Sequence, residues 1–563
     1  MAARVHSEGG CAPLRRPFWQ SQPVRFAHLG RDALGPRPRG RPGLNRLANG
    51  SGLPPPEPQL ASRLGVRLLV AALAGFALHL AYPRPGWDLL GWVSVAPVLA
   101  LAATARSPQH AFFEGWVAGA AFFVPLLRWL THTMTTFSTL TWPVAVLVLL
   151  GLAGYLALYW GAVAAGVAWL RAPLGVAGLW LAPPFWVAAE LGRTHLLSGF
   201  PWGLLGYVPY RRLDLIQIAA WTGVYGVSCL LAVVNAALAW SLVRRTRLAA
   251  AQSAGVVVLA VAVALAFGAA RGPAPAGGTV PVAIVQGNID QAIKWDKAYQ
   301  RQTLEIYAEL TRGGAPGARL VIWPEAAVPG YVRYEPWVLG WLTGLAEEVH
   351  TPLLVGAPDA RPEGQGTRFL NSAFLVSGRG VTTRYDKMHL VPFGEYVPLK
   401  RLLFFVEAIA ADIGDFTAGR QRVIFPLEGA PFGTVICYEV IFPDLVRQFV
   451  RGGASFMVNI TNDAWFGDSS GPLQHLAMVP LRAVENGIAI ARAANTGVSA
   501  LVAPSGRIGP ELGLFRRGFL QVAVPLRARE TFYTRFGDLF AYAMSAVTAA
   551  ALATRLLARQ PGS

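Results

Sequence analysis

Long apolar runs fill two parts of the chain, and a region of shorter, alternating runs separates them. Most of the long runs reach the ~20 residues with which an α-helix crosses a bilayer. The pattern therefore predicts a polytopic α-helical membrane domain over residues 61–271, with a last span within residues 536–557 and about eight spans in all. The apolar runs cover residues 64–82, 88–105, 110–130, 142–170, 174–192, 214–243, 248–270 and 537–556.

Residues 280–527 follow a different pattern, in which short β-branched runs alternate with helical stripes of apolar residues. Residues 282–285 and 319–323 are typical of strands, and residues 296–312 between them are typical of a helix. Further short runs, such as residues 433–436, continue the alternation. Strands that alternate with helices predict a layered α/β domain.

The start of the chain follows neither pattern. Residues 1–60 are rich in Arg, Pro and Gly without hydrophobic periodicity, which predicts a disordered tail. No apolar run precedes Cys11, so we expect neither a secretory signal peptide nor a lipoprotein cleavage site there. The whole chain is 53% hydrophobic and only 14% charged, which is typical of a membrane protein with an attached globular part.

The formal net charge of +18 does not indicate a nucleic-acid-binding protein, because the basic residues border apolar runs. Anionic headgroups and the positive-inside rule explain this distribution better. Basic loops at Arg106, Arg171 and residues 244–247 mark alternate connections, which places both termini in the cytoplasm and residues 280–527 outside. Residues 211–212 are also basic and lie on the opposite side, which weakens this assignment.

Several polar or aromatic residues interrupt the apolar runs. Glu114, Arg128 and Glu190 are costly in lipid, so we expect them to pair with one another or to lie at the interface. Residues 198–203 (SGFPWG) are typical of an interfacial aromatic belt.

Three short apolar runs each lead to a side chain that can do chemistry: Glu325, Lys387 and Cys437. Active sites of α/β sheets assemble where strands end. A thiolate next to a helix N-terminus is a nucleophile with a lowered pKa. A carboxylate can move its proton, and an ammonium can stabilise a tetrahedral oxyanion. Taken singly, each residue would more often be a surface charge or a core thiol.

These three residues match the Glu–Lys–Cys triad of the nitrilase superfamily of carbon–nitrogen hydrolases, which the chain resembles. Together with about eight spans, the chain is similar to the bacterial apolipoprotein N-acyltransferases. The resemblance implies an α-β-β-α layered sandwich for residues 280–527. The matching segments are residues 199–202 (GFPW), 286–296 (QGNIDQAIKWD), 387–395 (KMHLVPFGE) and 459–467 (NITNDAWFG).

The resemblance also implies an activity, a transfer in two steps without metal or cofactor. Cys437 would take an acyl chain from a phospholipid, typically phosphatidylethanolamine, as a thioester. The chain would then pass to the α-amine of the diacylglyceryl-cysteine of an apolipoprotein, the last step of lipoprotein maturation. Glu325 would act as general base and acid, and Lys387 would stabilise the intermediate.

Supporting roles follow from the same resemblance. Glu395 would be a second carboxylate of the site, and Tyr438 and Glu439 would border the nucleophile. Trp295 would lie on a mobile loop near the acyl entry. The protein is expected to act as a monomer in the inner membrane of a bacterium, with its catalytic domain on the periplasmic side.

Residues 402–410 form an apolar stretch inside the otherwise soluble part. It reads as a core helix or as a flap on the bilayer, and its basic flank favours the flap. Two other functions remain open. One is a membrane-anchored nitrilase-type amidase that acts on a small soluble amide, although a single anchor would suffice for it. The other is a transporter with an inactive domain, which the intact triad disfavours.

Overall fold

The computed structural model describes residues 58–272, 276–291, 294, 296–363, 366–392, 394–396 and 416–557. Three predictions concern residues outside these ranges: the tail before residue 58, Trp295 and the apolar stretch 402–410.

Helices account for the first part of the described chain and for its end. A helix forms within each predicted apolar run, but only four helical segments are long and apolar enough by themselves to cross a membrane, among the residues described. A fifth counts if the bent pair α3–α4 is one span. The total of about eight spans therefore stays a prediction. The main helices are α1 (Pro58–His79), α2 (Ala96–Thr104), α3 (Pro108–Leu126), α4 (Trp129–Phe137), α5 (Trp142–Leu174), α6 (Ala182–His195), α9 (Val224–Arg244), α10 (Arg247–Arg271) and α17 (Leu539–Leu557).

Two predicted runs are interrupted where the sequence breaks a helix. Pro125 lies in the last turn of α3, which ends at Leu126, and the chain bends by 51° into α4. The run predicted over residues 214–243 is not one helix: α7 (Leu213–Ile216) and α8 (Ala219–Thr222) come first, and Gly223 at φ +65° separates them from α9. A residue at such a φ cannot continue a right-handed helix.

The costly charges of the apolar runs find partners other than those expected. Glu114 forms an ion pair with Arg67 of α1. Glu190 accepts hydrogen bonds from the Trp186 indole at 3.0 Å and from the backbone N–H of Leu205 at 2.7 Å. Arg128 lies exposed at the bend between α3 and α4. Glu114 and Glu190 therefore have partners other than the predicted ones, and the alternative prediction of a place at the interface stays open for the exposed Arg128.

The part between α10 and α17 contains two six-stranded sheets with the orders β12-β1-β2-β3-β4-β5 and β11-β10-β9-β8-β7-β6. Parallel pairing of β1, β2 and β3, and of β7, β8 and β9, brings the carboxyl ends of these strands to one edge of each sheet. The strands are β1 (Ala276–Gln286), β2 (Leu320–Ile322), β3 (Leu353–Glu363), β4 (Gly366–Ser377), β5 (Gly380–Asp386), β6 (Ile424–Phe425), β7 (Phe432–Ile436), β8 (Phe456–Thr461), β9 (Ile490–Ala494), β10 (Ser499–Val502), β11 (Ile508–Leu512) and β12 (Gly518–Arg527).

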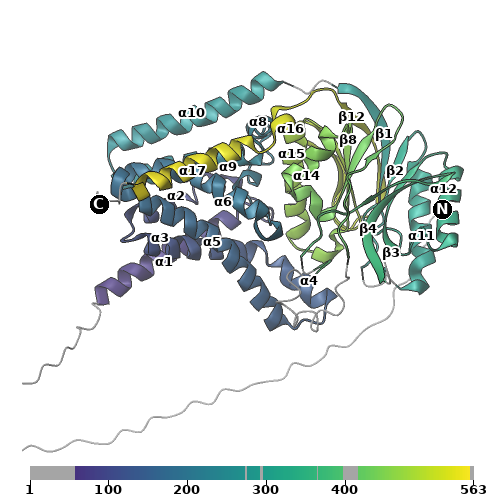
Figure 1. The fold of residues 1–563 in the computed structure, drawn as a ribbon, viewed down its shortest axis with the longest axis horizontal. Coiled ribbons are helices and arrows are strands. Elements are labelled where there is room, and N and C mark those ends of the chain that lie inside the picture. The colour runs from purple at the N-terminus through teal and green to yellow at the C-terminus, as the bar shows by residue number, and fades with distance from the viewer. Residues whose placement is uncertain are drawn as a thin grey trace, which may run out of the picture. The chain divides into compact units, whose positions relative to one another are not determined.

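Helices cover both outer faces of the paired sheets, which gives the α-β-β-α order (Figure 1). Successive side chains of β1 point to opposite faces of the sheet. Val282 and Ile284 belong to the large core between the sheets, and Ala283 and Val285 belong to a second core under the outer helices. The covering helices are α11 (Lys297–Gly314) and α12 (Pro336–Glu348) on one side, and α14 (Pro443–Arg451) and α15 (Gly471–Asn486) on the other.

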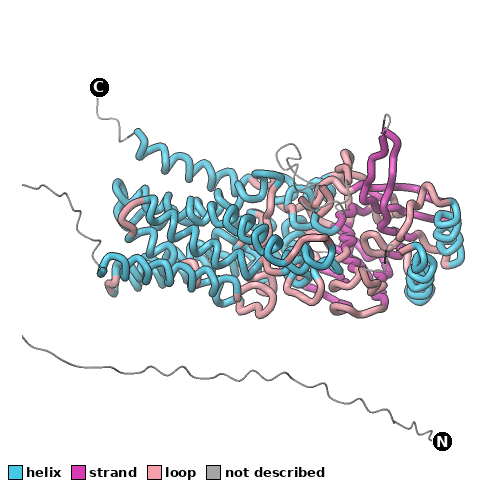
Figure 2. Tube along the Cα trace, turned by 90° about the horizontal axis from the view of Figure 1, so that it is seen from below, coloured by secondary structure: helices cyan, strands magenta, loops and turns pink. Residues whose placement is uncertain are grey.

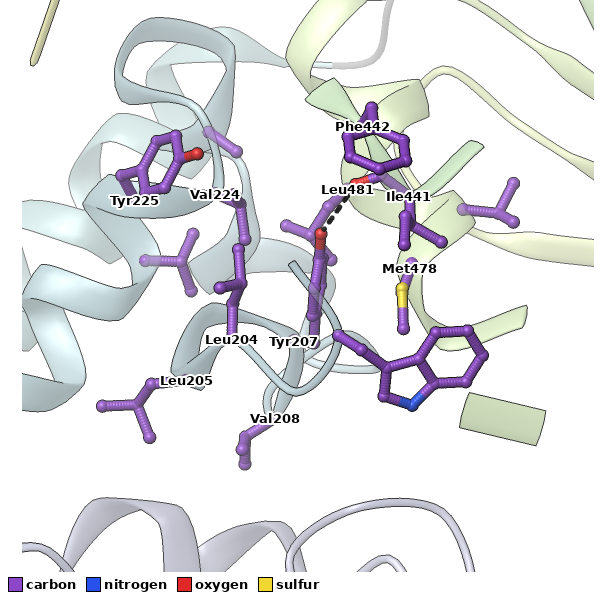
Figure 3. Close-up of a cluster of buried hydrophobic side chains, with 14 of the residues drawn as sticks. Leu204, Leu205, Tyr207, Val208, Val224, Tyr225, Ile441, Phe442, Met478 and Leu481 are labelled. Carbon is purple, nitrogen blue, oxygen red and sulfur yellow. Dashed lines mark hydrogen bonds between the residues drawn. The ribbon is translucent and has the colours of Figure 1, made fainter. Parts of the chain in front are cut away.

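The large core continues from the sheets through α14 and α15 into the membrane helices. Figure 2 shows the long apolar helices gathered at one end and the strands toward the other, and Figure 1 shows α14 and α15 between them. At the junction, Tyr207 donates a hydrogen bond to the carbonyl of Ile441 at 3.4 Å (Figure 3). The apolar side chains that meet there are Leu204, Leu205, Val208, Val224, Ile441, Phe442, Met478 and Leu481. Because each buried side chain of this kind contributes roughly 1.5–3 kcal/mol, the two parts are docked and not merely tethered.

The loop predicted as an aromatic belt also belongs to this junction. Trp202 is buried at 1% exposure and donates from its indole to Gln474 of α15 at 2.8 Å. Gly199 has φ +83°, and a Cβ there would lie 1.9 Å from the carbonyl oxygen of Thr194. The SGFPWG segment is therefore a docking loop, and its glycine permits a close backbone approach.

Candidate active site

The short turn after β7 presents Cys437. All residues of β7 are buried, and the strand ends at Ile436, directly before Cys437, which starts a 3-10 turn over Cys437–Ile441. Cys437 has φ +51°, a left-handed conformation that costs a non-glycine residue free energy. Such strain persists only where the surroundings fix the backbone, and it is typical of functional sites.

Glu439 fixes one side of this turn. Its carboxylate accepts hydrogen bonds from the N–H of Ile436 and the N–H of Met388, both at 2.7 Å. The Tyr385 hydroxyl donates to it at 2.7 Å and the N–H of His389 at 3.1 Å. Burial raises the pKa of Glu439 to about 7, although these donors oppose the shift. Glu439 therefore joins the cysteine turn to the segment that carries Lys387.

Glu325, Lys387 and Glu395 form one buried cluster. The Lys387 ammonium lies 3.2 Å from Glu325 Oε1 and 2.9 Å from Glu395 Oε2. Asn371 of β4 donates to both carboxylates, at 2.8 Å to Glu325 and 2.9 Å to Glu395. The N–H of Asn462, just after β8, donates to the other Glu325 oxygen at 2.9 Å. Both oxygens of Glu325 are thereby held, one by side chains and one by backbone.

The charges of Glu325 and Lys387 both act on the pKa of the Cys437 thiol, so the three predicted residues lie in one site. Burial and then the Glu325 charge raise the pKa of Cys437 far above its ordinary value. Burial alone would raise the pKa of Glu325, but Lys387 and Asn371 outweigh it and lower the pKa. Burial alone would lower the pKa of Lys387, but the two carboxylates outweigh it and raise the pKa. The resting site is thus a thiol, a carboxylate and an ammonium.

The prediction of a thiolate stabilised by a helix N-terminus is wrong for this resting state. The 3-10 turn stands between Cys437 and α14, which begins only at Pro443. Cys437 is only 8% exposed, and the negative charge of Glu325 lies near its thiol. Both effects favour the neutral thiol.

Tyr438 borders the nucleophile, but on the side of the membrane domain. Its hydroxyl donates to the carbonyl of Gly199 at 3.3 Å, and its ring lies 6.4 Å from that of Phe200. The docking loop is therefore a direct neighbour of the cysteine turn.

Sequence reasoning missed three residues that contact the triad: Asn371, Asn462 and His475. Asn462 lay within the quoted NITNDAWFG motif, which was a usable signal. Asn371 had none, because only the antiparallel pairing of β4 with β5 places it beside Lys387. His475 reaches the cysteine from α15, and its Nε2 lies 3.2 Å from the carbonyl oxygen of Cys437.

The arrangement is suited to acyl transfer. A thiol that attacks a carbonyl can lose its proton to Glu325, and Lys387 can stabilise the oxyanion that forms. Across the described ranges, no three or more His, Cys, Asp and Glu side chains are grouped so that they could hold a metal ion.

An α-β-β-α sandwich with a cysteine after β7, joined to apolar helices, defines a nitrilase-type enzyme with a membrane domain. Residues 281–533 match the Carbon-nitrogen hydrolase family, and residues 74–237 match the Apolipoprotein N-acyltransferase N-terminal domain. The chain belongs to the apolipoprotein N-acyltransferase family. It is 44% identical to the apolipoprotein N-acyltransferase of Geobacter metallireducens, over 86% of this chain and 95% of that protein. It is 36% identical to that of Brucella suis, over 83% of this chain and 91% of that one.

Among solved structures, the chain is similar to an amidase from Nesterenkonia sp.. The two are 24% identical, and the match covers 48% of this chain and 95% of the amidase with a TM-score of 0.34.

Proposed function

We propose that the protein is a phospholipid:apolipoprotein N-acyltransferase that works through a thioester on Cys437. One observation carries this proposal: the buried Cys437–Glu325–Lys387 cluster lies beside a loop of the membrane domain. Family membership supports the activity. The family resemblance implies the roles of Glu325 and Lys387, and the buried ion pair between them supports these roles.

The first half-reaction acylates the enzyme. Cys437 Sγ attacks the ester carbonyl of a phospholipid, while Glu325 takes the thiol proton. Lys387 stabilises the oxyanion of the tetrahedral intermediate. The intermediate collapses, the ester C–O bond breaks, and Glu325 returns the proton to the departing lysophospholipid oxygen.

The second half-reaction transfers the chain to the acceptor. The free α-amine of a diacylglyceryl-cysteine attacks the thioester carbonyl, and Glu325 takes a proton from the attacking nitrogen. The C–S bond breaks, the proton passes to the sulfur, and the thiol is restored. Glu395 and Asn371 would hold Lys387 and Glu325 in place through both steps.

The setting of this reaction is also a proposal. We infer that residues 61–271 and 536–557 hold the protein in the inner membrane by about eight spans, with residues 280–527 on the periplasmic side. Phosphatidylethanolamine is the expected donor, the acting form is a monomer, and no cofactor takes part.

A labelled donor tests the proposal directly. Purified protein given only phospholipid should release lysophospholipid about once per enzyme and carry an acyl group on Cys437 that hydroxylamine removes. A peptide with an S-diacylglyceryl N-terminal cysteine should discharge the acyl group, and the same peptide with a blocked amine should not. Cys437→Ala should give no adduct.

The amidase alternative predicts the opposite result. An unmodified Cys437 in the presence of phospholipid, together with ammonia release from small amides, would replace the acyltransferase assignment.

A further inference from the structure

His475 on α15 contacts the backbone of the nucleophile. Its Nε2 lies 3.2 Å from the carbonyl oxygen of Cys437, and its Nδ1 lies 3.2 Å from Arg492, which can donate to it, and 3.0 Å from Asp463 Oδ1. A carbonyl oxygen can only accept, so Nε2 carries the proton of the first bond. Arg492 forms an ion pair with the other oxygen of Asp463, Nη2 to Oδ2 at 2.7 Å. The histidine is fully buried, and the ring of Trp202 stacks on it at 5.8 Å.

The residue before it, Gln474, contacts the membrane domain. Its Oε1 accepts hydrogen bonds from the indoles of Trp202 at 2.8 Å and Trp129 at 3.3 Å. Its Nε2 donates to the carbonyl of Leu126 at 3.2 Å, where α3 bends into α4. Successive residues of a helix point about 100° apart, so these two can contact different partners at the same time.

We propose that His475 is a positioning residue that holds Cys437 in its left-handed conformation, and that Gln474 ties this support to the membrane domain. The inference rests on the proposed role of Cys437 as nucleophile. The φ of +51° must be stabilised by contacts on both sides of the turn. Before Cys437, the N–H of Ile436 donates a hydrogen bond to the Glu439 carboxylate. After it, His475 Nε2 donates to the carbonyl oxygen of Cys437.

The consequence concerns the rate of acylation. Misplacing a reacting atom by about 1 Å can cost roughly 10²-fold in rate. Loss of the His475 bond should therefore slow attack by Cys437 without changing how tightly phospholipid binds. The membrane helices would thus contribute to nucleophile geometry as well as to anchoring.

Two substitutions of His475 separate positioning from general stability. In His475→Gln, the amide nitrogen can occupy the place of Nε2 and keep the bond to Cys437. In His475→Asn, the shorter amide can replace only Nδ1 and keeps the contact with Asp463. We expect His475→Gln to form the thioester within about threefold of the wild-type rate, and His475→Asn to be about 10- to 100-fold slower at unchanged KM. Equal thioester rates in the two variants would overturn the positioning role.

Gln474 provides a second test that does not depend on the stability of the His475 variants. Gln474→Met and Trp202→Phe should each slow thioester formation, and the double variant should be less slow than the product of the two single effects, because both changes remove the bond between Gln474 and Trp202. Gln521→Met, an exposed glutamine of β12, is the matched control and should behave as wild type. Fully additive effects would contradict the link. A wild-type enzyme that forms no thioester would defeat the proposed function instead.

Discussion

Burial and the Glu325 carboxylate raise the pKa of Cys437, so the resting side chain is a thiol. The pKa of Glu325 is lowered and that of Lys387 is raised, so both stay charged at neutral and mildly alkaline pH. The ionised Glu325 carboxylate of the same buried site can take the thiol proton, and attack does not require a preformed thiolate. A neutral buried thiol also reacts slowly with oxidants, which would suit a free cysteine on the proposed periplasmic side.

This charge state makes a prediction about pH. None of the three groups should change its charge between about pH 7.5 and 9, so the rate constant of thioester formation should not rise steeply there. The neighbouring Lys294, whose pKa burial lowers to about 8, loses its charge in this window and can modulate the rate only through Glu325. A mechanism through free thiolate would raise the rate about tenfold per pH unit in the same window. Single-turnover measurements with labelled phospholipid distinguish the two. A steep alkaline rise would show that Glu325 is not the base.

Glu325 and Lys387 can be tested by nearly isosteric changes. Glu325→Gln removes the base and Lys387→Met removes the oxyanion partner, so each should lower acylation by roughly 10²-fold or more. Their exposed counterparts, Glu347→Gln and Lys297→Met, should leave the rate unchanged. The measurement is labelled lysophospholipid released per enzyme. Near-normal turnover in either active-site variant would remove that residue from the mechanism.

Strands and helices with strong local patterns were predictable. The apolar run 433–436 is β7, and the stripe after Pro443 is α14, which ends beside Gly452. The ends of β2 and β7 indicated Glu325 and Cys437 because parallel strands share an edge. Asn371 and His475 could not be found in this way. Their positions depend on an antiparallel register and on the docking of α15, neither of which leaves a local pattern.

The junction helix α15 carries a buried ion pair that can be tested by unfolding. Arg482 and Glu485 are both fully buried, and Arg482 Nη2 lies 2.6 Å from Glu485 Oε1. Arg482 also donates a hydrogen bond to the carbonyl of Ile441. Glu485 accepts from the N–H of Val224 of the membrane domain at 2.9 Å. Removing one partner leaves an uncompensated charge, so Arg482→Met should lower the free energy of unfolding by about 3–5 kcal/mol.

Changing both residues provides the control for this prediction. Arg482→Met combined with Glu485→Met leaves no unpaired charge and should recover part of the loss. Thermal unfolding in detergent measures both variants. An unchanged unfolding midpoint in Arg482→Met would mean that the pair contributes little to the junction.

At the scale of the whole molecule, one core extends from the sheets into the membrane helices. The composition indicated a membrane part and a globular part, but it gave no sign that they share a core. The shared core arises because Tyr207, Trp202 and Val224 each contact the catalytic part through long-range bonds. A soluble fragment starting near residue 280 would expose this junction, so the proposed activity is expected of the full chain.

The orientation in the membrane is the last prediction, and α10 allows a paired test. This helix runs from Arg247 to Arg271 and contains a segment apolar enough to cross a bilayer. Arg244, Arg245 and Arg247 cluster at its first end, which the positive-inside rule places in the cytoplasm. A reporter active only in the periplasm should be active when fused after Arg271 and silent when fused after Arg245. A reporter active only in the cytoplasm should give the reverse pattern at the same two positions.

Two outcomes would contradict this orientation. If both fusions report the same side, α10 does not span the membrane. If the pattern is inverted, the catalytic domain faces the cytoplasm and could not reach lipoproteins outside.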